Sequence, residues 1–250
     1  SIEATGATLA CDAIAYRKLM APFVADWEKI LDFVLGPLRP PRYPFSLARF
    51  ALLGIRSGAG LAQSLFKGEY ARALFAGMAA HSMLSLEQPL SATFGLMLAM
   101  LGHAVGWPMP RGGSQKIVDA LASYLRSLGG EIVTGMEVKS IDALPSARAI
   151  LFDVTPRQLL RIAGRRLPGG YQHQLQRYRY GPGVFKVDFA LDGPVPWKAE
   201  ACLRAGTVHV GGTLPQIAAA ERAVARGEHP ERPFVLTAQQ SLFDPTRAPT

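Results

Sequence analysis

The chain has 250 residues, of which 49% are hydrophobic and 18% are charged, with a formal net charge of +8 at pH 7. These proportions predict one or two folded domains with a substantial core and exclude a disordered tail. The positive charge is spread along the chain without a basic run that alternates with aromatic residues, so no nucleic-acid partner is expected.

The cysteines and the first residues indicate a cytoplasmic protein. Cys11 and Cys202 lie far apart, and neither has a second thiol nearby. This spacing excludes a disulfide framework and a cysteine zinc site and is typical of a reducing compartment. The chain begins at Ser1 without the basic segment or the cleavage site of a secretory signal.

Residues 1–110 are expected to form a mainly helical region. Hydrophobic residues recur at helical spacing through residues 16–35, which predicts one amphipathic face. Prolines interrupt the chain at 36–44, and helical spacing then resumes. Residues 73–84 are rich in small side chains, so helices there either pack closely or enclose a cavity.

The apolar stretch at 90–107 leaves three alternatives open. Between Glu87 and Arg111 no residue carries a formal charge, and the stretch is long enough to approach a bilayer thickness. It also contains His103, two hydroxyl side chains and three glycines, and prolines follow it. The alternatives are a buried helix or cavity wall, a surface that touches a membrane, and a true span.

Beyond residue 110 the pattern changes to helices that alternate with strands. A helix at 115–128 lies between two glycine pairs. The expected strands are 131–135, 137–142 and 149–154, and a turn at Thr155 and Pro156 leads from the last strand into a helix. This succession predicts a partial nucleotide-type α/β layer over residues 111–165.

Residues 166–250 are expected to form a mixed or antiparallel sheet crossed by one helix. Strand-like alternation with glycine turns recurs at 183–193, 206–213 and 233–242, and a helical pattern occupies 215–227. The whole chain is thus expected to be α/β to α+β, with a helical region, a partial nucleotide-binding layer and a sheet domain.

The glycine turn before the helix does not match a phosphate cradle. Such a cradle needs glycines between a strand and a helix, in a pattern such as G-x-G-x-x-G. Gly112, Gly113 and Ser114 open a helix, but no third glycine and no Walker lysine follow. Their spacing favours a tight turn capped by Ser114.

The segment PRGGSQKIVDALASYLRSLGGEIVTGMEVKSID (110–142) resembles the middle part of flavin-dependent oxidoreductases of the phytoene desaturase and amine oxidase superfamily. Four later segments resemble phytoene-dehydrogenase-related proteins in the same order: RAILFDVTPRQLL, YRYGPGVFKVDFALDGPVPW, AGTVHVGGT and SLFDPTRAP. The resemblance covers residues 110–249 and depends on this ordered series. It implies that the helical first region is the family's substrate-covering region.

The resemblance implies FAD as the cofactor, although the family's main FAD-binding motifs are absent from this chain. The family holds the pyrophosphate of FAD with G-x-G-x-x-G after its first strand, and a glycine-rich segment near its C-terminus completes the flavin site. Neither is present, and the glycines that begin at Gly58 follow no strand. The chain is therefore expected to be an internal fragment of a longer flavoprotein.

Three residues are candidates for cofactor binding through the resemblance. Val138 matches the position whose backbone pairs with the adenine of FAD, the alternative being an ordinary buried strand residue. Thr155 and Pro156 match the place where the family's chain passes near the dinucleotide. The alternative for them is the N-cap and the first residue of a helix.

Candidates for substrate binding are Trp107, His209 and Lys186. Trp107 matches the crossover near the isoalloxazine ring, where it would wall a substrate tunnel or belong to a core. His209 alternates with valines and either faces a cavity or is a satisfied sheet histidine. Lys186 shares a strand face with Asp188, at a cavity wall or in solvent. No histidines have metal-ligand spacing, so no metal is expected.

The resemblance implies an enzyme that oxidises a hydrophobic small molecule by hydride transfer to flavin, with the catalytic residues unassigned. The nearly charge-free cover suits a polyene, a lipid or a hydrophobic amine. A non-catalytic hydrophobic-ligand carrier or scaffold derived from the same substrate domain is the alternative, and a membrane-associated helical protein is a third. The bare apolar surfaces of a fragment predict self-association, and peripheral membrane contact is a further alternative.

Overall fold

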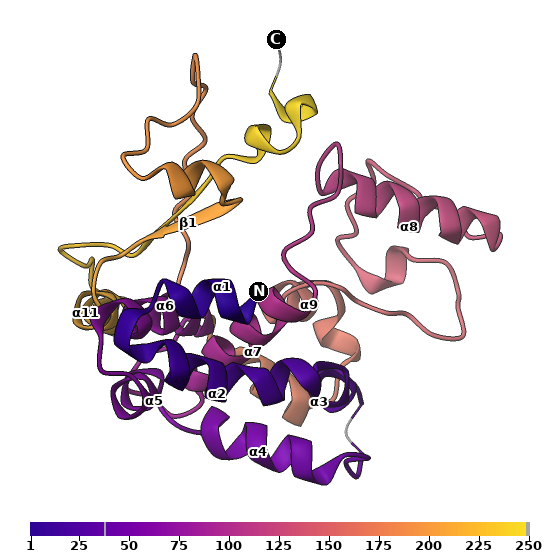
Figure 1. Cartoon of the computed structure of the whole chain (residues 1–250). Coiled ribbons are helices and arrows are strands. Elements are labelled where there is room, and N and C mark those ends of the chain that lie inside the picture. The colour runs from indigo at the N-terminus through magenta and orange to yellow at the C-terminus, as the bar shows by residue number, and fades with distance from the viewer. Residues whose placement is uncertain (38, 249–250) are drawn as a thin grey trace. The chain divides into compact units, whose positions relative to one another are not determined.

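The computed structural model describes residues 1–37 and 39–248, which are mostly helical with one antiparallel sheet of two strands (Figure 1). The coarse α+β prediction is confirmed. The chain divides into two compact units. The helical unit comprises Ser1–Ser114 and Pro182–Thr250, and the small unit comprises Gln115–Gly181.

The helical unit holds most of the regular structure. Its α-helices are α1 (Ile2–Ala7), α2 (Ala13–Ala25), α3 (Trp27–Val34), α4 (Pro44–Gly54), α5 (Gly58–Leu65), α6 (Glu69–Ala79), α7 (Ser91–Ala104) and α11 (Leu214–Ala225). Its strands are β1 (Thr207–Val210) and β2 (Val235–Ala238), and the 3-10 helix η2 (Ala80–Ser82) follows α6.

The amphipathic stretch expected over residues 16–35 is divided between α2 and α3. The division falls at Asp26, whose backbone leaves the helical region with φ −110° and ψ 16°. The Asp26 carboxylate accepts hydrogen bonds from Lys29 Nζ (2.6 Å) and Ser46 Oγ (2.7 Å). The bond to Ser46 joins the break to α4.

The central helix of the helical unit is α7, which packs against α2, α4, α5 and α6. Its buried residues are Ser91, Ala92, Gly95, Leu96, Ala99 and Met100. A Cβ added at Gly95 would lie 2.8 Å from Phe75 Cζ, so glycine allows α6 and α7 to approach closely. The buried-helix alternative for residues 90–107 and the close-packing alternative for 73–84 are confirmed. None of the helices in the described residues combines the length and apolarity that crossing a membrane requires.

Two buried polar side chains fix the ends of helices in this core. The carboxylate of Asp12, which is 2% exposed, accepts the backbone N–H groups of Lys67 (2.9 Å) and Gly68 (2.6 Å), just before α6. Ser91 Oγ accepts the N–H of Gly58 (2.8 Å) at the start of α5 and donates to Gln88 O (2.7 Å). The bonds to the N–H groups of Gly68 and Gly58 satisfy backbone groups that a helix start leaves without an intrahelical partner.

The strands β1 and β2 form an antiparallel ribbon, and α11 lies between them in sequence and packs on α6. His209 on β1 is opposite Leu236 on β2. The predictions of strands near 206–213 and 233–242 and of the intervening helix are confirmed. The strand expected at 183–193 is wrong: no ladder forms there, and Phe185 remains 92% exposed. A segment with alternating polar and apolar residues forms a ladder only where the backbone of a neighbouring strand pairs with it.

The small unit contains α8 (Gln115–Ser127), α9 (Pro156–Ala163) and α10 (Gly169–Gln176). The glycine pair after α8 ends that helix: Gly129 has φ +81°, its N–H donates to Arg126 O, and the Gly130 N–H donates to Leu125 O, both at 3.0 Å. This is the Schellman arrangement. The predicted helix at 115–128 is therefore confirmed, with its end one residue earlier.

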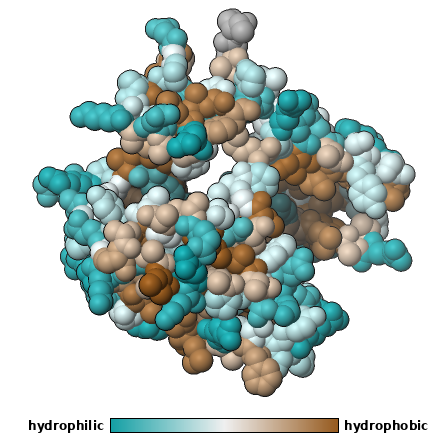
Figure 2. Space-filling model, in the orientation of Figure 1, coloured by the Kyte–Doolittle hydropathy of each residue, from teal (hydrophilic) through white to brown (hydrophobic). Residues whose placement is uncertain are grey.

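The prediction of regular strands in this unit is wrong. The segments 131–135, 137–142 and 149–154 are fully described and form no ladder. Isolated strands are unstable without backbone partners. The unit buries little: Ala163 is the one residue of 115–181 that is buried. The exposed apolar residues of α8 and of the turn after it are Ile117, Val118, Leu121, Tyr124, Leu125 and Leu128. Figure 2 shows hydrophobic surface, in brown, along α8.

Replacing Asp12 tests the buried carboxylate. We expect Asp12→Ala to lower the free energy of unfolding by about 2–4 kcal/mol, because two backbone N–H groups lose a charged acceptor. Asp12→Asn keeps one acceptor oxygen and should lose roughly half as much. Urea denaturation measures both. Glu3→Ala, at an exposed site, is the control, and a value for Asp12→Ala as small as that of the control would contradict the prediction.

The open face of α8 predicts self-association. We expect the mass measured by light scattering to rise above the 26.9 kDa of the chain as concentration increases. Leu121→Lys should reduce this rise, since it places a charge in the middle of the apolar face. Ser123→Lys adds the same charge on the polar face of the same helix and should leave association unchanged. A clean monomer for the unsubstituted chain at all concentrations would contradict the prediction.

Candidate functional site

The three residues expected near the cofactor lie in the small unit. Val138 is half-buried in the irregular segment between α8 and the next helical turn. Thr155 is the N-cap of α9 and Pro156 is its first residue. Thr155 forms a capping box with Gln158, whose Oε1 accepts the Thr155 N–H at 2.9 Å. Thr155 and Pro156 are thus the N-cap and the first residue of a helix, which confirms the alternative given for them from the sequence.

An aromatic and basic cluster lies beside this cap. The hydroxyl of Tyr180 accepts the backbone N–H of Arg157 at 3.2 Å, and the Arg157 guanidinium lies 4.7 Å from the centre of the Tyr180 ring. Hydrogen bonds from Thr155 and Arg157 lower the pKa of Tyr180. The ring of Tyr178 meets Tyr180 edge-on at 5.2 Å. This exposed cluster brings a cation and two phenols to the start of α9.

The glycine turn before α8 already holds an anionic group from the same chain. Gly112 and Gly113 have φ of +80° and +94°. The Gly112 N–H donates to Asp244 Oδ2 at 2.6 Å, and the Gly112 carbonyl accepts from Arg247 at 3.2 Å. Hydrogen bonds from Thr246 and from Gly112 lower the pKa of Asp244. The turn therefore binds a carboxylate of the C-terminal segment.

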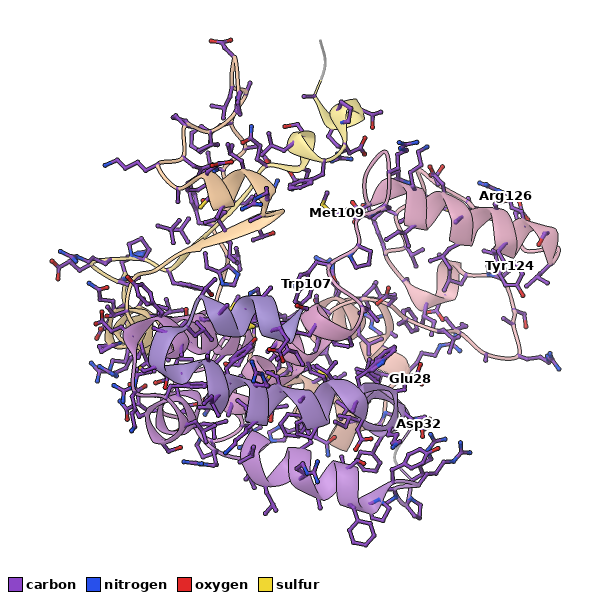
Figure 3. All side chains as sticks on the ribbon, in the orientation of Figure 1. Glu28, Asp32, Trp107, Met109, Tyr124 and Arg126 are labelled. Atoms are coloured by element: carbon purple, nitrogen blue, oxygen red, sulfur yellow. The ribbon has the colours of Figure 1, made fainter. Side chains whose placement is uncertain are left out.

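The residues predicted to bind the substrate have different neighbours within the helical unit. Trp107 is 65% exposed, and its indole Nε1 would lie 3.0 Å from a Cβ added at Gly102 on α7. Figure 3 shows Trp107 and Met109 on the segment after α7. Lys186 is exposed and forms an ion pair with Asp188, which matches the solvated alternative for this lysine.

His209 belongs to a histidine pair that joins β1 to η2. Its Nε2 lies 3.2 Å from Nε2 of His81, and the ring centroids are 5.0 Å apart. The ring of Phe234 meets His209 edge-on at 5.4 Å. Burial lowers the pKa of both histidines, and in His209 the charge of His81 lowers it further. The neutral imidazoles thus present ring nitrogens to each other.

A second histidine contact, inside the helical unit, was not expected. Tyr16 on α2 and His103 on α7 share a hydrogen bond of 2.7 Å between the hydroxyl and Nε2. Burial raises the pKa of Tyr16 to about 12 and lowers the pKa of His103. The phenol therefore stays protonated and shares this hydrogen bond with a neutral imidazole, whose tautomer sets which group donates. Phe66 and Phe75 continue the aromatic row from Tyr16 into the core.

A shallow hollow of about 450 Å³ lies between α5 and α11. It is lined by Ser57, Ala59, Gly60, Gln63, Glu87, Leu214, Pro215, Ala218 and Arg222. Burial acts to raise the pKa of Glu87, but hydrogen bonds from Arg222 and Ser85 outweigh it and lower that pKa. The hollow is open to solvent, with apolar side chains in its lining and the Glu87–Arg222 ion pair beside them.

Comparison with protein-family models, with curated proteins and with solved structures finds no match to this chain. The functional interpretation therefore depends on the residues of the chain itself.

Sequence spacing could not have revealed either histidine contact. His81 and His209 are 128 residues apart, and Tyr16 and His103 are 87 residues apart. No local period links residues at such separations. The one available signal was the placement of each histidine beside small or apolar residues, which is also typical of an ordinary core position.

The half-buried imidazole of His103 predicts a loss of stability in acid. Its pKa is lowered in the folded state, while a histidine in the unfolded chain has a pKa of about 6.5. Stability should therefore be full above that pH and fall as the pH drops below it, because the unfolded chain takes up the proton more readily. Urea denaturation at a series of pH values measures this slope.

His103→Gln should reduce the slope, since the glutamine amide can still hydrogen-bond to the Tyr16 hydroxyl but does not titrate. His173→Gln, at an exposed site on α10, is the matched control and should leave the slope unchanged. An unaltered slope in His103→Gln would show that this histidine does not carry the effect.

Proposed function

We propose that the chain is an interior part of an FAD-dependent oxidoreductase resembling the phytoene dehydrogenases, which oxidises a hydrophobic substrate by hydride transfer to flavin. One observation carries the proposal. The small unit joins an amphipathic helix, whose apolar face is open, to strand-like segments that have no partner strands among the described residues. These features fit one half of a cofactor-binding layer whose sheet is completed by other parts of a longer protein.

The exposed apolar surface of the small unit supports this interpretation. Leu151, in the expected strand 149–154, is 94% exposed, and Val133 in the expected strand 131–135 is also exposed. Figure 3 shows Tyr124 and Arg126 on opposite sides of α8, so one side of the helix is apolar and the other is charged. Packing of α8 on a sheet would remove this apolar area from water and pair the backbone of the strand-like segments.

The helical unit supports a hydrophobic substrate. Its central helix α7 contains no Asp, Glu, Lys or Arg, and the segment after it exposes Val105, Trp107 and Met109. Apolar side chains exposed together are typical of surfaces that meet an apolar ligand or partner. We propose a polyene, a lipid or a hydrophobic amine as the substrate, in a cytoplasmic protein that contacts no nucleic acid. Peripheral membrane contact remains part of the proposal.

The residues present do not by themselves fit FAD. The Thr155 N–H is engaged in capping α9, and the Gly112 N–H is engaged by Asp244. Val138 lies in an irregular segment, where no strand edge presents its backbone. We therefore propose that the main anchors of FAD lie elsewhere in the longer protein, and we assign no catalytic residue to this chain.

A non-catalytic carrier or scaffold for hydrophobic ligands is the second candidate. The backbone N–H groups of Thr155 and Gly112 form hydrogen bonds within the chain, which favours this candidate. In a carrier that had lost its cofactor, these groups would have only such structural bonds.

Flavin binding by the longer reading frame separates the two candidates. We expect the protein expressed with its neighbouring coding sequence to carry the visible absorption of bound flavin in a one-to-one ratio, while residues 1–250 alone stay colourless. A colourless longer protein that still binds a hydrophobic fluorescent probe would favour the carrier and contradict the enzyme.

We further propose that a partner strand in the longer protein orders the segment around Val138, so that the Val138 backbone pairs with the adenine of FAD; this contact offers a sharper test. Val138→Pro removes the backbone N–H and should weaken FAD binding by about three- to tenfold, the range expected for one hydrogen bond. Val138→Ala keeps the N–H and is the matched control. Equal FAD affinity in the two variants would contradict the proposed adenine contact.

A further inference from the structure

The histidine pair supports an inference independent of the flavin proposal. We propose that His81 and His209 form a two-histidine binding site for a divalent transition-metal ion, with Zn²⁺ as the best-fitting ion. His81 comes from η2, directly after α6, and His209 comes from β1. The site therefore joins two segments of the helical unit that are 128 residues apart in sequence.

The separation of the two nitrogens fits shared metal ligation. Two Zn–N bonds of about 2.0–2.1 Å that meet near the tetrahedral angle hold their nitrogens about 3.3 Å apart. The Nε2 atoms of His81 and His209 are 3.2 Å apart. Imidazole nitrogen is a preferred ligand of zinc, and other transition ions bind it as well.

The orientation of the rings also fits a common ion. The ring centroids are 5.0 Å apart and the ring planes are inclined by 44°. Rings aligned end to end across a gap of 3.2 Å would have more distant centroids, because each centroid would lie a full ring radius behind its nitrogen. The two rings are therefore bent relative to each other across the gap, as two imidazoles on one tetrahedral ion are.

Neighbouring residues hold His209 in this position. A Cβ added at Gly77 on α6 would lie 3.0 Å from His209 Nδ1, so the glycine gives the imidazole room against the helix. Phe234 meets the other side of the ring edge-on. His81 is exposed, so an ion can enter from solvent. Packing of this kind pre-orients a metal ligand and reduces the entropy lost on binding.

The site has two protein ligands. Within the described residues, no group of three or more His, Cys, Asp or Glu side chains is placed to hold a metal. Water or an added ligand would complete the tetrahedral coordination that Zn²⁺ prefers. Because the two histidines lie on η2 and β1, metal binding would fasten the β1–β2 ribbon to the end of α6.

Zinc titration of the folded 250-residue chain, without a polyhistidine tag, tests the proposal. The Zn²⁺ affinity is measured by competition with a chromophoric chelator. We expect one site per chain, and a loss of at least about tenfold in affinity for either His81→Gln or His209→Gln, because each removes half of the protein ligands. His103→Gln and His229→Gln are the matched controls and should retain the affinity.

Gly77→Ala tests whether zinc affinity depends on the position of the His209 ring or only on the presence of both histidines. It keeps both histidines but crowds His209 Nδ1, so its affinity should lie between that of the unsubstituted chain and that of His209→Gln. The melting temperature of each variant without zinc shows whether it folds. Zinc should also slow amide hydrogen exchange at residues 207–210 and 235–238 in the unsubstituted chain, and should not do so in His81→Gln.

Retention of the full zinc affinity in folded His81→Gln or His209→Gln overturns the proposal, and so does the lack of a one-to-one site in the unsubstituted chain. Neither result bears on flavin binding by the longer protein. The two proposals can therefore fail separately.

Discussion

The close approach of α6 and α7 is the constraint on which the helical unit depends. α7 carries no formally charged side chain, and its Gly95 lies against the ring of Phe75. A methyl group at this position would meet Phe75 Cζ at 2.8 Å, so the helices would have to separate. Because α7 also contacts α2, α4 and α5, its depth in the core sets where the other helices lie.

The C-terminal ribbon depends on one of these helices, α6. α11 packs on α6, and His209 fits over Gly77, near the end of α6. Gly95 on α7 and Gly77 on α6 therefore have similar roles. Gly95 leaves room for the ring of Phe75, and Gly77 leaves room for the ring of His209. The histidine pair arises where the end of α6, continued by η2, meets β1. A proposed metal ion would reinforce a contact that close packing has already formed.

The small unit follows a different physical rule. Its helices are well capped, with a capping box at Thr155 and a Schellman turn at Gly129, yet it buries little of its surface. Local hydrogen bonds define helix ends, but they do not provide a hydrophobic core. The open apolar side of α8 and the unpaired segments beside it are therefore where a partner, another copy of the chain or the rest of a longer protein would add the missing burial.

The sequence alone determined three local features of this structure: the helix at 115–128 with its glycine stop, the cap at Thr155 and Pro156, and the strand around His209. These features depend on residues within a few positions of one another. Only the tertiary structure decided which strand-like segments paired, because 207–210 found a partner in 235–238 while 131–135, 149–154 and 183–193 did not. It also decided the contacts of His81 with His209 and of Tyr16 with His103. Such contacts depend on the packing of distant helices, and no local pattern encodes them.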